Sequence, residues 1–286
     1  MNDTCIKLYT ALKRKDISFI GSHDVHTPQP LVEEVLSYLP LSNSTILVLF
    51  NVEFVISLVY TYNVDPNRIT FFTDHTNKSL ICTRMNIKYT DTLETDMKFD
   101  IIVGNPPYND NSGNRGSGHT LWTEFVKLAY NKLVKPEGYL VYVHPSGWRQ
   151  YNHKLRSTML EKQIVYLEIH DEKDGQRVFK CNTRYDWYVM HNVPYTKKTT
   201  IMCQDGVITK QNLTQWNFIP NRAYDRLLEL MAKNDSDKIN LVYSESAYEG
   251  RKAWMSKEPS DIHIYPCVCS AAIAASKELK IGRAHV

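Results

Sequence analysis

The chain has 286 residues, of which 43% are hydrophobic and 23% are charged, and its formal net charge is +3. These values are ordinary for a folded globular protein and argue against a disordered, collagen-like or coiled-coil chain. No apolar run approaches the roughly 18 residues of a membrane span, and the first residues lack the apolar core of a secretory signal, so we expect a cytoplasmic protein without membrane contact.

The first two thirds of the chain alternate between helical and strand patterns. Thr27 is the expected N-cap and Pro28 the first position of a helix that should stop at Pro40. Short apolar runs rich in Ile, Val and Phe follow, as expected of strands buried on both faces. These expected strands are residues 46–50, 69–72, 99–103, 139–144, 164–169 and 186–190.

The expected helices lie between these strands. One is capped by Thr120 and ends at residues 135–138, and a later one covers residues 223–232. Alternating strands and helices predict an α/β fold with a mainly parallel sheet and helices on both faces. Functional residues should lie at the carboxyl ends of the strands. The inner face of the Thr120-capped helix should be Leu121, Phe125, Ala129 and Leu133.

The strand at 99–103 runs through Gly104 directly into Asn105-Pro106-Pro107-Tyr108. Two successive prolines cannot continue a sheet ladder, so they project rigidly from the strand end. We expect the Asn105 amide and the Pro106 carbonyl to face outward, where two acceptors can take both hydrogens of an exocyclic amino group. The Tyr108 ring would stack on the base that carries this group. The alternative is a proline-rich turn that only ends a strand.

This segment resembles the amino-group DNA methyltransferases that use S-adenosylmethionine, in particular the adenine N6 enzymes with an Asn-Pro-Pro-Tyr motif. The resemblance covers residues of about 23–192 and implies a Rossmann-like methyltransferase fold with a seven-stranded, mainly parallel sheet. It assigns catalysis to Asn105, Pro106, Pro107 and Tyr108. Cytosine N4 members more often carry Ser in place of Asn105, so adenine is favoured, and the base would leave the duplex to react.

The resemblance also implies where the cofactor, S-adenosylmethionine, binds. Thr27-Pro28 is similar to the family segment that closes over the methionine end of the cofactor. Asp74 follows the second strand and would accept from the ribose hydroxyls, with a solvated surface acid as the alternative. Asp91 resembles the acid that accepts from the cofactor adenine, and Asp96 competes for that role.

One departure from the family concerns the turn after the first strand. Family members usually have a glycine-rich turn there, whereas this chain has no glycine between Gly21 and Gly104. We expect Asn51 to adopt the left-handed conformation that most residues resist, and Glu53 to receive the ammonium group of the cofactor. The alternative is a degenerate site that no longer binds the cofactor.

Two aromatic residues are assigned to the substrate base. Phe179 lies where related enzymes set a second ring against the flipped base, and Trp148 would line the base pocket. Either side chain could equally belong to the core. No metal is expected, because the six cysteines form no CxxC pair and the histidines lack ligand spacing. Methyl transfer from a sulfonium requires only alignment and electrostatics.

The last third of the chain holds the excess positive charge, with 13 Lys and Arg against 10 Asp and Glu from Thr196 onward. We predict a catalytic domain at 1–195, a truncated target-recognition domain at 196–280 and a non-native tail at 281–286, which resembles a translated adapter. A small structural domain would show the same mixture of aromatic and basic residues. The interleaved residues are Trp216, Phe218, Arg222, Tyr224, Arg226, Tyr243, Tyr248, Arg251, Lys252 and Trp254.

The expected partners are double-stranded DNA and a cognate restriction endonuclease, and the protein is expected to be a monomer. Two other functions stay open: methylation of RNA or of a protein glutamine amide, which Asn-Pro-Pro-Tyr also serves, and a DNA-binding module that has lost catalysis. The adenine interpretation requires that the Asn105 corner adjoin a hollow wide enough for two nucleosides.

Overall fold

The computed structural model describes residues 7, 26–73, 76–94, 96–108, 121–232, 234–237, 255–256, 259–261, 265–270 and 280–284. The chain divides into two compact units, Met1–Leu227 and Leu228–Val286. Within the described ranges, none of the helices has the length and apolar character needed to cross a membrane.

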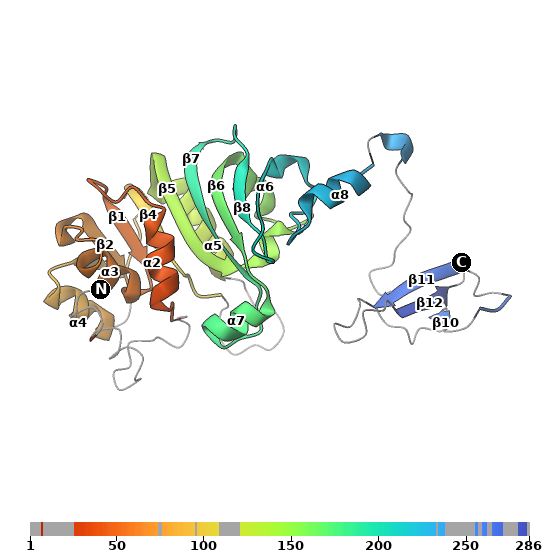
Figure 1. The fold of residues 1–286 in the computed structure, drawn as a ribbon. Coiled ribbons are helices and arrows are strands. Elements are labelled where there is room, and N and C mark those ends of the chain that lie inside the picture. The colour runs from red at the N-terminus through yellow and green to blue at the C-terminus, as the bar shows by residue number, and fades with distance from the viewer. Residues whose placement is uncertain are drawn as a thin grey trace. The chain divides into compact units, whose positions relative to one another are not determined.

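The first unit is built on a mixed sheet of nine strands in the order β3-β2-β1-β4-β5-β7-β6-β8-β9 (Figure 1). Only β7 and β9 run antiparallel to their neighbours. The mainly parallel α/β fold is therefore confirmed, with nine strands instead of seven because residues 199–211 add two. The strands are β1 (Ile46–Leu49), β2 (Ile69–Phe72), β3 (Lys88–Thr90), β4 (Phe99–Gly104), β5 (Val134–Pro145), β6 (Lys162–Ile169), β7 (Tyr185–Pro194), β8 (Thr199–Met202) and β9 (Ile208–Gln211).

Helices pack on both faces of this sheet. Successive residues of β1 belong to different cores, with Ile46 and Val48 on the face covered by α2 and α3 and Leu47 and Leu49 on the face covered by α5 and α6. The two-residue period of a strand explains this alternation. The helices are α2 (Gln29–Ser37), α3 (Val52–Tyr60), α4 (Thr76–Arg84), α5 (Leu121–Leu128), α6 (Arg156–Glu161), α7 (Glu172–Phe179) and α8 (Tyr224–Leu230).

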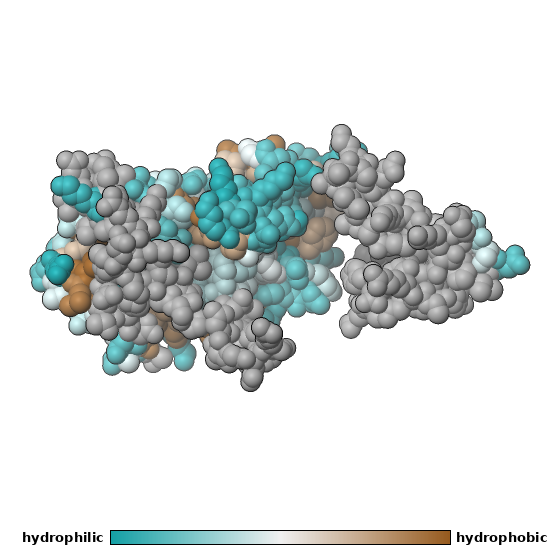
Figure 2. Space-filling view, turned by 90° about the horizontal axis from the view of Figure 1, so that it is seen from below, coloured by the Kyte–Doolittle hydropathy of each residue, from teal (hydrophilic) through white to brown (hydrophobic). Residues whose placement is uncertain are grey.

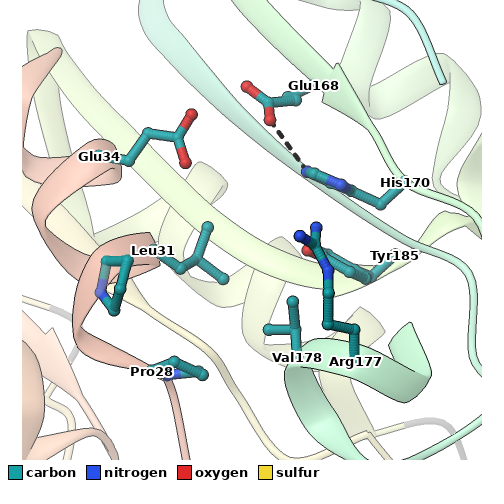
Figure 3. A pocket seen from close by; sticks show the side chains of 9 residues that line it. Pro28, Leu31, Glu34, Glu168, His170, Arg177, Val178 and Tyr185 are labelled. Carbon is teal, nitrogen blue, oxygen red and sulfur yellow. Dashed lines mark ion pairs between the residues drawn. The ribbon is translucent and has the colours of Figure 1, made fainter. Parts of the chain in front are cut away.

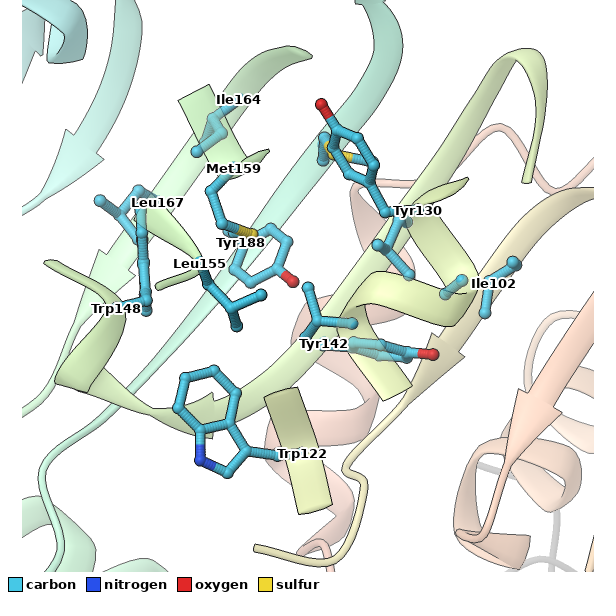
Figure 4. Packing of buried hydrophobic residues seen from close by; sticks show 14 of the residues in the cluster. Ile102, Trp122, Tyr130, Tyr142, Trp148, Leu155, Met159, Ile164, Leu167 and Tyr188 are labelled. Atoms are coloured by element: carbon cyan, nitrogen blue, oxygen red, sulfur yellow. The ribbon is translucent and has the colours of Figure 1, made fainter. Parts of the chain in front are cut away.

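The core under α5 is aromatic-rich (Figure 4). Its buried helix residues include Trp122 and Val126, whereas Leu121 and Phe125 are only half-buried, so the expected inner face was one position too early for these two residues. The π-helical turn Ala129–Leu133 follows α5 directly and buries both of its end residues, as expected. Such a turn changes the helical phase. Thr120, the expected cap, lies outside the described residues.

The strand order reverses at β1, which pairs with β2 on one side and β4 on the other. Leu49 is in register with both Phe72 and Gly104, and Phe72 is in register with Thr90. The residues that follow these four strands therefore start from the same edge of the sheet. In open α/β sheets, ligands bind at such a switch point outside the carboxyl ends of the strands.

Residues beyond 195 do not all leave the first unit, which extends to Leu227. Trp216 and Tyr224, two residues of the expected DNA-reading set, are buried in its core with their ring centroids 5.1 Å apart. Neither ring is placed to read DNA. The first unit therefore includes sequence that we expected to belong to the target-recognition domain.

The second unit contains a small antiparallel sheet in the order β10-β12-β11. These strands are β10 (Met255–Ser256), β11 (Tyr265–Ser270) and β12 (Lys280–Ala284). Most of the expected non-native tail thus pairs in β12.

On one face of the molecule, hydrophilic residues cover most of the described surface and hydrophobic ones form only small separate areas (Figure 2).

Candidate functional site

The Asn-Pro-Pro-Tyr segment leaves the sheet at the end of β4, as expected. Asn105 has no exposed surface. Its backbone N–H donates to Asn51 Oδ1 at 2.7 Å, and its Nδ2 donates to Thr27 Oγ1 at 3.3 Å. The expectation that the Asn105 amide faces outward is therefore wrong: its side chain is held inside, between the turn after β1 and the segment before α2.

The side-chain oxygen of Asn105 is the exception to this satisfied network. Asn105 Oδ1 is buried and has no hydrogen-bond partner among the described residues. Leaving a buried acceptor unsatisfied costs about 1–3 kcal/mol. One hydrogen of the amide nitrogen is engaged by Thr27, whereas the acceptor Oδ1 and the Tyr108 hydroxyl have no partner among the described residues.

Tyr108 completes the segment and is half-buried, with its ring packed on the aromatic core. Burial raises the pKa of its phenol well above the ordinary value, Cys181 and Tyr185 raise it further, and the Asn105 amide offsets part of the shift. The phenol therefore stays neutral near pH 7. A neutral ring of this kind suits stacking better than proton transfer.

Thr27 does not cap a helix. The N-cap of α2 is Pro28, without a side-chain cap, and the Thr27 hydroxyl accepts from Asn105 instead. The Thr27 N–H donates to Glu53 Oε1 at 3.3 Å, and His26 Nδ1 lies 2.5 Å from the same oxygen. Thr27 and Glu53, both assigned to the cofactor from sequence, are thus brought together beside Asn105.

The turn after β1 differs from our expectation. Asn51 has a φ of −102° and Phe50 has a φ of +66°, so the left-handed residue is Phe50 and not Asn51. This conformation costs a bulky residue about 1–2 kcal/mol. The Phe50 ring offsets the cost by packing edge-on against Phe72 at 5.1 Å and Phe125 at 4.8 Å.

A lysine that sequence reasoning missed holds this turn. Lys78 of α4 is 3% exposed and donates from Nζ to the Phe50 carbonyl at 2.6 Å. The available signal was its spacing, because Lys78 lies one helical turn before the buried Cys82 and so faces inward. Burial raises the pKa of the Cys82 thiol to about 12, and Lys78 counteracts part of that shift.

The acids assigned to the cofactor nucleoside are only partly described. Asp74 lies outside the described residues. Asp91 is exposed directly after β3, and its competitor Asp96 is exposed as well. Their exposure therefore does not indicate which of the two acids would accept from the cofactor adenine.

A cavity of about 360 Å³ lies between α2 and α7 (Figure 3). Its floor includes His170, which stacks on the Tyr185 ring at 4.3 Å and lies 3.1 Å from Glu168. Burial opposes the charge of His170, but Glu168 and Asp174 raise its pKa above the ordinary value. The residues that line the cavity are Pro28, Pro30, Leu31, Glu34, Glu168, His170, Arg177, Val178 and Tyr185. Pro28 follows Thr27 in the sequence, but neither Thr27 nor Asn105 lines the cavity, so this cavity is not the hollow beside Asn105 that the adenine interpretation requires.

The two residues assigned to the substrate base lie in different environments. Phe179 is half-buried at the end of α7, with its ring 4.9 Å from the Tyr185 ring. Trp148 is fully buried, and its Nε1 donates to Asp186 Oδ2 at 3.0 Å. Trp148 is therefore a core residue and not part of a base pocket, because both its ring and its polar atom are used inside the protein.

The burial of His144, near the end of β5, predicts that the folded protein loses stability in acid. His144 is fully buried and stacks on Trp122 at 4.4 Å, and burial lowers its pKa to about 4 from 6.5. The unfolded chain binds the extra proton between these two values, so stability falls as pH drops through this window, by about 2 kcal/mol at pH 5. Urea unfolding at pH 7 and pH 5 should show a smaller loss for His144→Gln than for the wild type; equal losses would contradict this assignment.

Gly104 permits the close approach of β1 and β4 at the site. A Cβ there would lie 2.6 Å from the Leu49 carbonyl oxygen, whereas one at Gly147 would meet nothing closer than 3.9 Å. We therefore expect Gly104→Ala to destabilise the chain by about 1–3 kcal/mol, as overpacking does, and Gly147→Ala to be nearly neutral. Thermal unfolding of the two variants compares them, and equal melting temperatures would show that the strand ends adjust freely.

No group of three or more His, Cys, Asp or Glu side chains in the described part of the chain could hold a metal ion.

Residues 54–179, which include the Asn-Pro-Pro-Tyr segment, match the family model described as Eco57I restriction-modification methylase. The modification methylase CviBIII of Paramecium bursaria Chlorella virus NC1A is 32% identical over 139 residues, which cover 43% of this chain and 36% of that protein.

Two solved structures share the fold at low sequence identity. One comes from a study of a type I R-M system, with a TM-score of 0.51, 12% identity, and coverage of 72% of this chain and 49% of that one. The other is a modification subunit of a putative type I restriction enzyme from Vibrio vulnificus YJ016, with a TM-score of 0.51, 15% identity, and coverage of 78% and 56%. The chain spans about a third of the curated relative and about half of each structural relative.

Proposed function

Because residues 54–179 resemble restriction-modification methylases and lie on a Rossmann-like sheet, we propose that this chain carries the catalytic part of a DNA adenine N6 methyltransferase. The observation that carries the proposal is the Asn105 corner. It lies at the switch point of the sheet. Among the described residues the Tyr108 hydroxyl has no hydrogen-bond partner, and neither has the acceptor Asn105 Oδ1. An exocyclic amino group supplies the donor that this atom lacks.

The proposed cofactor is S-adenosylmethionine, which supplies an activated methyl group. The edge after β1, β2 and β3 fits a nucleoside with a charged tail, because Glu53 places a 5% exposed carboxylate there. Glu53, with Thr27 and Pro28, would hold the methionine end. Asp74 and Asp91 would hold the nucleoside. Asn51 is better assigned to positioning Asn105, since its Oδ1 accepts the Asn105 N–H.

In the proposed reaction the adenine amino group is held by two acceptors. Asn105 Oδ1 would accept one hydrogen and the Pro106 carbonyl the other, which would direct the nitrogen lone pair toward the methyl group. As the N–C bond forms, the S–C bond breaks to leave a neutral thioether, and one amino proton is released to water. Tyr108 stacks on the base, with Phe179 on its other side. Flipping the base costs a few kcal/mol of stacking and pairing. Since Asn105 has no exposed surface, base entry also requires the corner to open.

The substrate and partners extend the same proposal. The relatives are named as parts of restriction and modification systems, so we assign double-stranded DNA as the substrate and a restriction endonuclease as the partner activity. The chain covers only part of those relatives, and target recognition would draw on the second unit.

Incubation of the full chain with duplex DNA and S-adenosylmethionine labelled in the methyl group tests this function. After digestion, chromatography should place the label in N6-methyladenine. Label in N4-methylcytosine would move the assignment to cytosine, and label in RNA or in protein glutamine would support the other acceptors. Retained DNA affinity without any cofactor binding in calorimetry would instead indicate a binding module.

A further inference from the structure

The turn after β1 contains no glycine. In the structure a lysine side chain holds this turn instead. We propose that Lys78 is a positioning residue: its ammonium group holds the Phe50 carbonyl and thereby fixes Asn51 against the catalytic corner. The inference rests on the proposed function, because it assigns Lys78 to the cofactor turn of that same site.

Two hydrogen bonds flank a single peptide unit. Lys78 Nζ donates to the Phe50 carbonyl at 2.6 Å, and the next residue, Asn51, accepts the Asn105 N–H at 2.7 Å. The Phe50 carbonyl belongs to the peptide that joins Phe50 to Asn51, so its orientation sets the direction in which Asn51 leaves β1. Lys78 thus acts on Asn105 indirectly, through the Phe50–Asn51 peptide and the Asn51 side chain.

The chemistry of the contact suits a lysine. A left-handed residue turns its carbonyl away from the regular ladder, and a buried carbonyl requires a donor. An ammonium group is a strong, charge-assisted donor. Lys78 is 3% exposed, and burying an ammonium group without hydrogen bonds would be costly. The contact therefore holds both groups in place.

The role explains how a bulky residue can stand where glycine would be easier. Glycine adopts a positive φ without steric cost, whereas Phe50 at +66° must be held there. The Phe50 N–H is fixed by the Phe72 carbonyl at 3.1 Å. Lys78 fixes the opposite end of the same residue, so the turn is held by contacts with β2 and α4 instead of by intrinsic preference.

The test compares Lys78→Met with Lys88→Met, which removes an exposed cation from the nearby strand β3. In Lys78→Met we expect at least tenfold weaker binding of S-adenosylmethionine in calorimetry and at least tenfold lower kcat on duplex DNA. We expect the control to stay within twofold of the wild type in both. Hydrogen exchange of the peptides that cover 50–54 and 105–108 should accelerate at least tenfold only in Lys78→Met.

A double-mutant cycle with Phe50→Gly tests the reason for the effect. If Lys78 holds a strained residue, Lys78→Met should weaken cofactor binding less than threefold in the Phe50→Gly background. The lost ring contacts of Phe50 enter both arms of the cycle and cancel. Equal losses in both backgrounds would overturn the proposal.

Unchanged exchange and binding in folded Lys78→Met would also overturn the proposal. If Lys78→Met does not fold, Lys78→Arg is the test variant, because it keeps a charged donor. We expect Lys78→Arg to bind S-adenosylmethionine within threefold of the wild type. A tenfold loss of this affinity in the folded variant would contradict the positioning role. A wild type that binds no S-adenosylmethionine contradicts the proposed function, and hydrogen exchange then still decides the positioning role.

Discussion

Replacing Asn105 with alanine should lower kcat for DNA methylation by a factor of about 10²–10³ or more, the range seen when one electrostatic partner of a reacting group is removed. The variant loses Oδ1, the acceptor that has no partner within the protein among the described residues. It also loses the Nδ2 contact with Thr27, which costs only about 1 kcal/mol of stability. Cofactor affinity should therefore change little, which calorimetry checks alongside the label-transfer assay.

Asn192→Ala is the matched control for this prediction. Asn192 of β7 also donates from its Nδ2, to the Lys135 carbonyl at 2.9 Å, but it plays no part in the proposed site. Its loss should leave kcat unchanged. Normal turnover in folded Asn105→Ala would remove Asn105 from the catalytic role.

Replacing Arg149 with methionine should destabilise the first unit by about 3–5 kcal/mol, because it leaves a buried charge without its partner. Asp186 is fully buried and accepts from Arg149 Nε at 2.7 Å. Arg149 also donates to the Ile219 carbonyl at 2.9 Å and to Asn221 Oδ1 at 2.8 Å. The pair thus joins β7 to sequence beyond β9, and urea unfolding of the full chain measures its loss.

Arg177→Met provides the comparison, because Arg177 pairs with Asp174 at 2.8 Å while its side chain is 74% exposed. An exposed pair contributes about 0–1 kcal/mol. The double variant Arg149→Met/Asp186→Leu should recover part of the loss by removing the stranded carboxyl group. Similar destabilisation by Arg149→Met and Arg177→Met would contradict the importance of burial.

The pH dependence of Arg149→Met gives a second check. Burial already raises the pKa of Asp186 above its ordinary 3.8 while Arg149 lowers it, so removing Arg149 raises it further. A folded-state pKa above the unfolded value means that the folded chain holds the proton more tightly. The deficit of the variant relative to the wild type should therefore shrink as pH falls toward 4.

The sequence by itself determined most of the elements and the place where the Asn-Pro-Pro-Tyr segment leaves the sheet. Apolar runs such as Ile69–Phe72 became strands with the expected bounds, because a segment buried on both faces carries its pattern locally. Asn105-Pro106-Pro107-Tyr108 left the sheet where two prolines require it. The α/β class followed from these local features, and the Asn-Pro-Pro-Tyr segment carried the methyltransferase resemblance, which implied the Rossmann-like fold.

Only the tertiary structure decided which partner each polar group meets. Thr27 had the chemistry of a helix cap, yet its hydroxyl faces Asn105 across 78 residues of chain. Phe50, and not Asn51, took the left-handed conformation because Phe72, Phe125 and Lys78 are brought around it. Trp148 became core because Asp186 and Arg149 are buried beside it. Conformational preference acts between neighbours in sequence, whereas burial and long-range hydrogen bonds exist only once distant segments have packed.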